Sequence, residues 1–252
     1  MKKIFIAGKW KLGGGKPTKS YYPADHSQNA EISTASLDDV NEAILAADAA
    51  WRHSDWRDTL PSEKATILFK VANLLEDKKT FLAKLQTRDN GKPISETMGL
   101  ANSAIATTRY IASCLETLDN ELTNQRIKSV LTFTTYEPLG VVAAITPWNS
   151  PIASEIQKII PALAGGNAVI LKPAEATSLI ALELATILEE AGLPAGLFSV
   201  LTGRGSVVGE AIVKHPLVQK ISFTGSTSTG RHLAHVAAEK LISTSLELGG
   251  KS

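Results

Sequence analysis

The stretch VVAAITPWNSP, residues 141–151, joins a short apolar run to a polar turn held between two prolines. The segments AVILKPAE, LFSVLTG, KISFTG and STSLELGG repeat this change later in the chain, and helical patterns separate them. Apolar strands that alternate with helices are typical of a parallel sheet covered on both faces. We therefore predict an α/β fold with a doubly wound parallel sheet of five strands in residues 140–252.

The first part of the chain has a different pattern. Residues up to about 34 read as short strands and turns, broken at Gly8. Apolar residues at helical spacing then predict a helix over 37–51 with Ser36 as its N-cap, and two more helices over 60–90 and 94–118. A polar loop is expected at 120–128 and a strand within 129–138.

Composition narrows the function classes. The chain has 252 residues, is 44% hydrophobic and carries a net charge of +1, without the clustered positive charge that nucleic acid requires. No stretch approaches the roughly 20 apolar residues of a membrane span. A single cysteine, Cys114, permits no internal disulfide and favours a cytoplasmic setting. The histidines show no spacing typical of metal ligands, so no metal site is predicted.

Ligands of such sheets bind beyond the carboxyl ends of the strands. At one end, FTGSTSTG (residues 223–230) places Gly225 and Ser226 where a helix begins. This is either an ordinary capped turn or a phosphate site made by the free N–H groups of the helix. At another end, Lys172 and Glu175 in KPAE form either a surface ion pair or a pair that hydrogen-bonds ribose hydroxyls.

Two more polar residues follow strands. Asn149 in TPWN is either a helix cap or an amide donor to a developing oxyanion. Glu247 in LELGG is either an edge glutamate in solvent or a general base whose pKa burial would raise. Cys114 shares a predicted helix face with Ile111 and Leu115 and is expected to be a small buried side chain.

Taken together, these segments resemble the NAD(P)-dependent aldehyde dehydrogenases. The matching text is EPLGVVAAITPWNSP, IIPALAGGNAVILKPAEATSL, GLPAGLFSVLTG, ISFTGSTSTG and LELGGKS, with a weaker match in IAGKW, DDVNEAILAADAAW and DNGKPISE. The resemblance runs from about residue 4 to residue 252. It implies a Rossmann-like domain that binds NAD, or alternatively NADP, and an oxidoreductase that converts an aldehyde to a carboxylic acid.

The resemblance also implies roles for individual residues. Asn149 would hold the oxyanion and Glu247 would activate water. Lys172 and Glu175 would contact the adenosine ribose, and Gly225, Ser226 and Gly230 would form the diphosphate turn. Trp148 would line the nicotinamide side, and the Leu248 carbonyl would contact the cofactor amide. Further cofactor contacts are implied for Thr146, Pro147, Gly205, Gly209 and Phe223.

The family's nucleophilic cysteine follows the ELGG motif, and Cys114 does not match its position. The resemblance therefore divides the chain into a cofactor-binding domain (1–119 and 139–252) and an oligomerisation hairpin (120–138), with the catalytic-cysteine domain expected to be absent. A fragment, a split enzyme whose second chain supplies the thiol, and a non-catalytic dinucleotide-binding or assembly module all remain open. A complete enzyme would be a homo-oligomer. Small or polar residues after TPWN, namely Ala153, Ser154 and Gln157, predict an aldehyde tunnel that tolerates polar groups.

Overall fold

A seven-stranded sheet forms the centre of the molecule in a computed structural model that describes residues 1–251. The strand order is β11-β10-β7-β8-β9-β1-β2. The strands are β1 (Ile4–Ile6), β2 (Lys9–Lys11), β7 (Val141–Ile145), β8 (Ala168–Lys172), β9 (Phe198–Val200), β10 (Val218–Thr224) and β11 (Ser243–Glu247).

The five predicted strands, β7 to β11, are confirmed, and they pair with one another in parallel. β7 and β8 consist almost entirely of buried Val, Ile, Leu and Ala, which suits strands covered on both faces. β1 and β2 extend this sheet at the β9 edge, where the pairing is antiparallel. The tight turn between them places both Ala7 and Gly8 at positive φ (52° and 78°).

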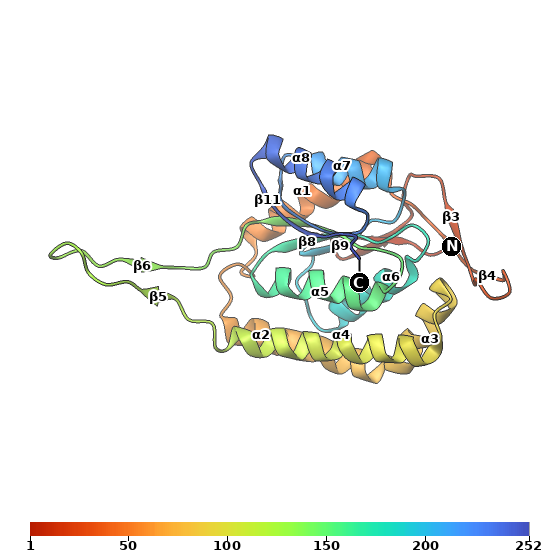
Figure 1. The fold of residues 1–252 in the computed structure, drawn as a ribbon, viewed down its shortest axis with the longest axis horizontal. Helices are drawn as coiled ribbons and strands as arrows, with labels where there is room; N and C mark the ends of the chain where they lie inside the picture. Colours follow the sequence, from red (N-terminus) through yellow and green to blue (C-terminus); the bar gives the residue numbers. More distant parts are fainter. Residues whose placement is uncertain (252) are drawn as a thin grey trace.

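Helices cover both faces of the sheet (Figure 1). On one face lie α1 (Leu37–His53), α7 (Glu210–Lys214) and α8 (Thr227–Lys240), and on the other lie α5 (Pro151–Ala164) and α6 (Leu179–Glu190). A further layer packs on α5 and α6 and consists of α2 (Pro61–Asp77), α3 (Lys79–Asn90) and α4 (Ile94–Leu115). The predicted N-cap of α1 is confirmed: the Ser36 hydroxyl accepts from the Asp39 N–H while the Asp39 carboxylate accepts from the Ser36 N–H.

Three local predictions are wrong in detail. The single helix expected over 60–90 is two helices that meet at Lys78, where no glycine or proline signals the break. The helix expected after β9 begins with a π-helical turn, η1 (Gly205–Gly209). The expected strand within 129–138 is only β6 (Phe133–Thr134), and its partner β5 (Glu121–Leu122) lies in the expected loop.

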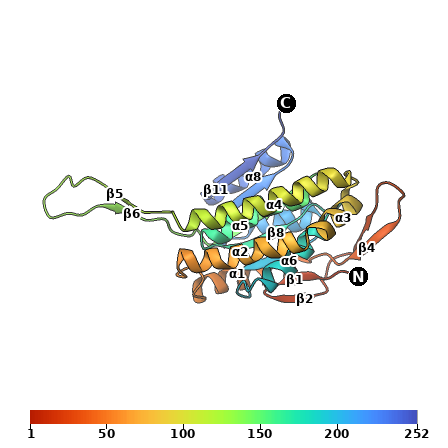
Figure 2. The same ribbon diagram turned by 90° about the horizontal axis from the view of Figure 1, so that it is seen from below.

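The hairpin that carries β5 and β6 projects away from the body in both views (Figures 1 and 2). A second small sheet pairs β3 (Thr18–Tyr21) with β4 (Gln28–Ile32) near the amino terminus. Within residues 1–251, no helix combines the length and apolar character that crossing a membrane would require.

Candidate functional site

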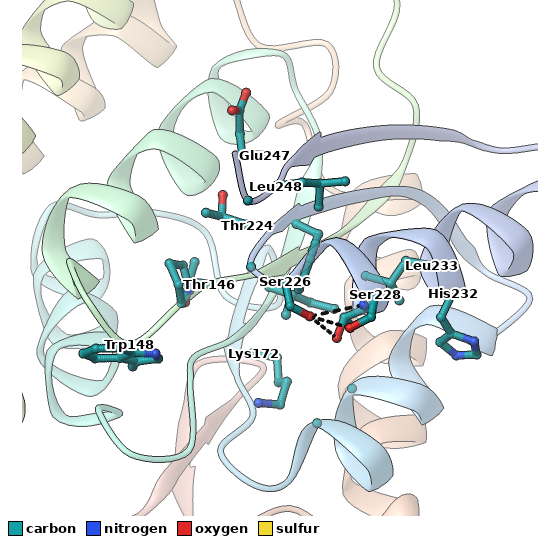
Figure 3. Close-up of a pocket in the computed structure, with 18 of the residues that line it drawn as sticks. Thr146, Trp148, Lys172, Thr224, Ser226, Ser228, His232, Leu233, Glu247 and Leu248 are labelled. Atoms are coloured by element: carbon teal, nitrogen blue, oxygen red, sulfur yellow. Dashed lines mark hydrogen bonds between the residues drawn. The ribbon is translucent and has the colours of Figure 1, made fainter. Parts of the chain in front are cut away.

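The carboxyl ends of β7, β8, β10 and β11 border one cavity of about 1330 Å³ (Figure 3). The sequence predicted this edge as the ligand site, and twelve of the fourteen predicted site residues line the cavity. They are Thr146, Pro147, Trp148, Asn149, Lys172, Gly205, Gly209, Phe223, Gly225, Ser226, Glu247 and Leu248. The exceptions are Glu175 and Gly230.

The start of α8 supplies the polar wall of the cavity. Ser226 caps this helix through its Oγ, which accepts from the Thr229 N–H at 3.2 Å. Hydrogen bonds also join the Ser226 hydroxyl to those of Ser228 and Thr229 (Figure 3). The first turn of a helix leaves backbone N–H groups without intrahelical partners and carries a partial positive charge. An anion such as a diphosphate is therefore favoured at this point of the cavity.

Close packing around two glycines shapes the same turn. The Phe223 ring occupies the space that a Cβ on Gly225 would need, and the Leu248 side chain does the same at Gly230. The Gly225 N–H also donates to the Glu247 carbonyl at 3.0 Å, which ties the end of β11 to the turn. Gly230 thus lies behind Leu248, so the cavity wall there is Leu248 and not Gly230.

Lys172 ends β8 and is the one predicted cation of the cavity. Its side chain is buried, with 4% of the residue exposed, and its Nζ donates to the Pro173 carbonyl at 2.8 Å. Burial lowers the pKa of Lys172 to about 8, and the nearby Glu175 carboxylate opposes this shift. The ammonium therefore has few partners of its own and can donate to a hydroxyl group that enters the cavity.

Glu175, in contrast, faces a neighbouring hollow of about 330 Å³. Its Oε1 lies 3.8 Å from the Arg204 Nε, so the ion pair at this turn is with Arg204 and not with Lys172. Lys172 and Glu175 thus line different hollows, because the Glu175 carboxylate lies toward Arg204, in the segment that precedes η1. Their joint contact to a ribose stays a prediction.

The turn after β7 forms the opposite wall. Thr146 is buried, and its Oγ1 has no hydrogen-bond partner among residues 1–251. The amide of Asn90, at the end of α3, donates to the Trp148 and Asn149 carbonyls at 3.4 Å and 3.1 Å and so holds the turn. Trp148 and Asn149 line the cavity and are exposed to solvent. Figure 3 shows Trp148 at this wall.

Glu247 is exposed at the end of the edge strand β11. Its exposed side chain lies at the solvent edge of the sheet, and its role as a general base stays a prediction. Glu247 also borders a second cavity of about 770 Å³, which is lined by Lys158. The Lys158 Nζ donates to the Ser222 Oγ at 3.3 Å, and burial lowers the Lys158 pKa while Glu247 opposes the shift.

Several lining residues were not predicted. Ser228 and Thr229 belong to the FTGSTSTG turn and could have been inferred from it. Glu210 and His232 could not, because they lie 22 positions apart and no motif joins them. The His232 Nε2 lies 2.7 Å from the Glu210 Oε2 and so closes the cavity between α7 and α8. The remaining additions are Ile145, Ser206, Thr224, Leu233 and Gly249.

Two other sequence expectations fall outside this cavity. Cys114 is half-buried near the end of α4, less buried than expected, and lines neither large cavity. Of the predicted tunnel residues, Gln157 lines the second cavity, whereas Ala153 and Ser154 line neither. Among residues 1–251, no group of His, Cys, Asp and Glu side chains is arranged to hold a metal ion.

The chain is similar in sequence and in fold to known aldehyde dehydrogenases. The profile of the aldehyde dehydrogenase family matches residues 10–252. Phenylacetaldehyde dehydrogenase from Pseudomonas fluorescens is 42% identical over 99% of this chain and 51% of its own length. Betaine aldehyde dehydrogenase from Staphylococcus aureus, solved in complex with NAD+, has a TM-score of 0.96 and 30% identity over 99% of this chain and 50% of its own.

An E. coli NADP-dependent enzyme has a TM-score of 0.96 and 36% identity, with coverage of 100% of this chain and 52% of its own. The chain thus spans about half the length of the relatives that it matches. Because the family profile covers all but the first residues, the chain belongs to the aldehyde dehydrogenase family.

Proposed function

We propose that this chain forms the nicotinamide-dinucleotide site of an NAD(P)-dependent aldehyde dehydrogenase, which oxidises an aldehyde to a carboxylic acid. One observation carries the proposal: the buried Lys172 and the first turn of α8 border one cavity at the carboxyl edge of a parallel sheet. These are the donors that a ribose hydroxyl and a diphosphate need.

The groups that line the cavity, as well as its position in the fold, suit a dinucleotide. The Thr146 Oγ1 is buried without a partner among the described residues, and a ligand donor or acceptor would satisfy it. Gly209 borders the cavity opposite Lys172, and a Cβ there would lie 3.4 Å from the Lys172 Cδ, so a larger residue would narrow the cavity at the ammonium.

In the proposed reaction, bound NAD(P)+ would supply the hydride acceptor. The chain's own residues would bind and orient the cofactor and stabilise charge. The first turn of α8 would hold the diphosphate, and Lys172 would donate to the adenosine ribose. The Asn149 amide stabilises negative charge on the carbonyl oxygen. Glu247, at the mouth of the cavity, takes the proton of the water that releases the acid.

The attacking thiol is proposed to come from another segment or chain, because Cys114 lines neither cavity. The position of Cys114 equally favours a second candidate function, a dinucleotide-binding or assembly module without catalysis. We further propose that the protein assembles as a homo-oligomer and works in the cytoplasm.

Fluorescence titration with NAD+ tests the proposed site. Trp148 is 63% exposed and borders the cavity, so bound cofactor should quench its emission. A Trp148→Phe variant should lose this signal while binding persists by calorimetry. No NAD+ or NADP+ binding by either method would refute the enzyme and the dinucleotide-binding module, and would leave only the assembly module. NADH formation from an aldehyde, absent from the 252-residue chain and present once the thiol segment is supplied, would favour the enzyme over the module.

A further inference from the structure

The last turn of α3 holds the beginnings of two helices that follow strands of the sheet. The Gln86 Oε1 accepts from the Ile152 N–H at 2.9 Å. The Asp89 Oδ2 accepts from the Leu179 N–H at 3.0 Å. Ile152 lies in the first turn of α5, after β7, and Leu179 begins α6, after β8. The end of α3 therefore fixes both helix starts at the edge of the sheet that borders the proposed cofactor cavity.

Asn90 extends this contact from α3 to the loop between β7 and α5. Its Nδ2 donates to the Trp148 carbonyl at 3.4 Å and to the Asn149 carbonyl at 3.1 Å. Its Oδ1 accepts from the Lys92 N–H at 3.1 Å. The orientation of the Asn90 amide is thus determined, because its oxygen has a donor of its own and its nitrogen faces two carbonyls.

Asn149 is held through its backbone. Within residues 1–251, the hydrogen bond from Asn90 reaches the Asn149 carbonyl and leaves the side-chain amide available to a ligand in the cavity. Pro147 and Pro151 restrict the backbone on either side, so movement of the loop is confined to residues 148–150. An oxyanion donor is most effective when its position is fixed before the reaction begins. The contact from Asn90 therefore limits the movement of the proposed donor.

We propose that Asn90 is a positioning residue for aldehyde oxidation, which holds the backbone of Trp148 and Asn149 so that the Asn149 amide meets the carbonyl oxygen of the aldehyde. The inference rests on the proposed function. Without the Asn90 donor, the loop can move and the Asn149 amide is no longer fixed toward the developing negative charge. The chemical step should therefore slow more than substrate or cofactor binding weakens, because an oxyanion donor acts chiefly in the transition state.

Fluorine NMR of the 252-residue chain, labelled with fluorotryptophan, tests the contact without catalysis. The chain has four tryptophans, and Trp148→Phe identifies the Trp148 resonance. Asn90→Asp keeps an acceptor for the Lys92 N–H and loses the donor to the two carbonyls, so it should shift or broaden this resonance and leave the other three in place. Asn90→Ala, which adds no charge next to the buried Asp89, should do the same. An unchanged Trp148 resonance in both variants would show that Asn90 does not hold the loop.

Steady-state kinetics of the complete enzyme, in which the thiol segment is supplied, separate positioning from a general loss of structure. Asn90→Asp and Asn90→Ala should each lower kcat roughly tenfold or more, with the aldehyde KM and the NAD+ affinity within about threefold. In an Asn149→Ala background, the same changes should alter kcat by less than about twofold, since the donor that Asn90 positions is gone. Asn102→Asp, the same chemical change on the exposed face of α4, is the matched control and should leave every reading unchanged.

The outcomes distinguish this inference from the proposed function. If NAD+ binds and the changes at Asn90 lower kcat by the same factor with and without Asn149, raise the KM instead, or have no effect, the positioning role is refuted and the cofactor site stands. If neither NAD+ nor NADP+ binds, the proposed function is refuted and this inference fails with it.

Discussion

The burial of Lys172 predicts a measurable pH dependence of cofactor binding. Its folded-state pKa is about 8, against 10.5 for an exposed lysine, because burial disfavours the ammonium. Folding therefore carries a penalty that is fully present below about pH 8 and is lost as the pH rises toward 10.5. Cofactor binding has the opposite dependence, since an acceptor such as a ribose hydroxyl favours the charged form.

We predict that NAD+ affinity falls as the pH rises through 8. Deprotonation of Lys172 would weaken binding by up to roughly tenfold at about pH 9. Calorimetry at several pH values measures this. Lys172→Gln should bind more weakly at pH 7 and lose the dependence between about pH 7 and 9. The control Lys84→Gln, on the exposed face of α3, should keep it; a retained slope in Lys172→Gln would contradict the assignment.

A second buried ionisable group lies outside the cavity. Glu155 on α5 is fully buried, and neither carboxylate oxygen has a partner among residues 1–251. Burial and the nearby Asp89 raise the pKa of Glu155 well above its usual range. Burial also raises the pKa of Asp89 to about 6, although Ser20 and the Leu179 N–H donate to it.

Both shifts have the same sign. The folded state binds more protons than the unfolded state above about pH 4, so stability falls as the pH rises from there through 6. For Asp89 alone the difference is about 3 kcal/mol.

We predict that Glu155→Gln stabilises the protein near neutral pH. The amide keeps the shape and removes the need to bury a charge or to take up a proton on folding. The free energy of unfolding should rise by about 1 to 3 kcal/mol at pH 8 and change little at about pH 4. Denaturant unfolding at both pH values measures it. Glu189→Gln, on the exposed end of α6, is the control, and an equal gain in the control would contradict the prediction.

At the scale of elements, one residue of α8, Ser226, both stabilises the helix and borders the proposed diphosphate site. Ser226 is its N-cap, and Asp and Asn cap helices about as well as Ser. Only Asp would place a negative charge beside the proposed diphosphate.

We predict that Ser226→Asp lowers NAD+ affinity by roughly tenfold or more, while Ser226→Asn lowers it far less. Both variants should melt within a few degrees of the unaltered protein, because each retains a cap. Calorimetry and thermal unfolding supply the two readings. Equal loss of affinity in both variants would mean that the hydroxyl, and not the charge at this helix end, controls binding.

The elements also show where sequence reasoning succeeds and fails. Apolar runs such as VVAAI and AVILK predicted β7 and β8 because buried parallel strands need continuous apolar residues. The break at Lys78 escaped prediction because no glycine or proline marks the end of α2. The addition of β1 to the β9 edge escaped prediction because Phe5 pairs with Val200, and a pairing between such distant parts of the chain leaves no local pattern.

The site divides in the same way. Residues such as Ser226 and Lys172 were predictable because each lies at or near the end of a strand, and strand ends of a parallel sheet meet at one edge. The direction of the Glu175 side chain was not predictable, since it depends on Arg204, which lies in another loop. The Glu210–His232 pair depends in the same way on how α7 packs against α8.

At the scale of the whole molecule, the β5–β6 hairpin does not pack on the globular part of the structure. It projects from the globular part, and its strands contain only two residues each (Figures 1 and 2). Two-stranded hairpins are marginally stable alone in water. This hairpin nonetheless exposes a series of large apolar side chains: Leu122, Ile127, Val130, Leu131, Phe133 and Tyr136. Exposed apolar surface of this extent is typical of a protein contact.

We predict that the hairpin holds copies of the protein together. Replacement of residues 121–134 by a short Gly-Ser linker should yield monomers by light scattering, because the apolar contact is lost. NAD+ affinity should stay within about twofold, since no hairpin residue lines the cofactor cavity. The double variant Leu131→Ser and Phe133→Ser should shift the equilibrium the same way, whereas Lys128→Ser, an exposed polar change on the same hairpin, should not. An unchanged oligomer after hairpin replacement would place the contact elsewhere, and the exposed edge of β11 would then be the next surface to alter, because an unpaired strand edge can pair with another chain.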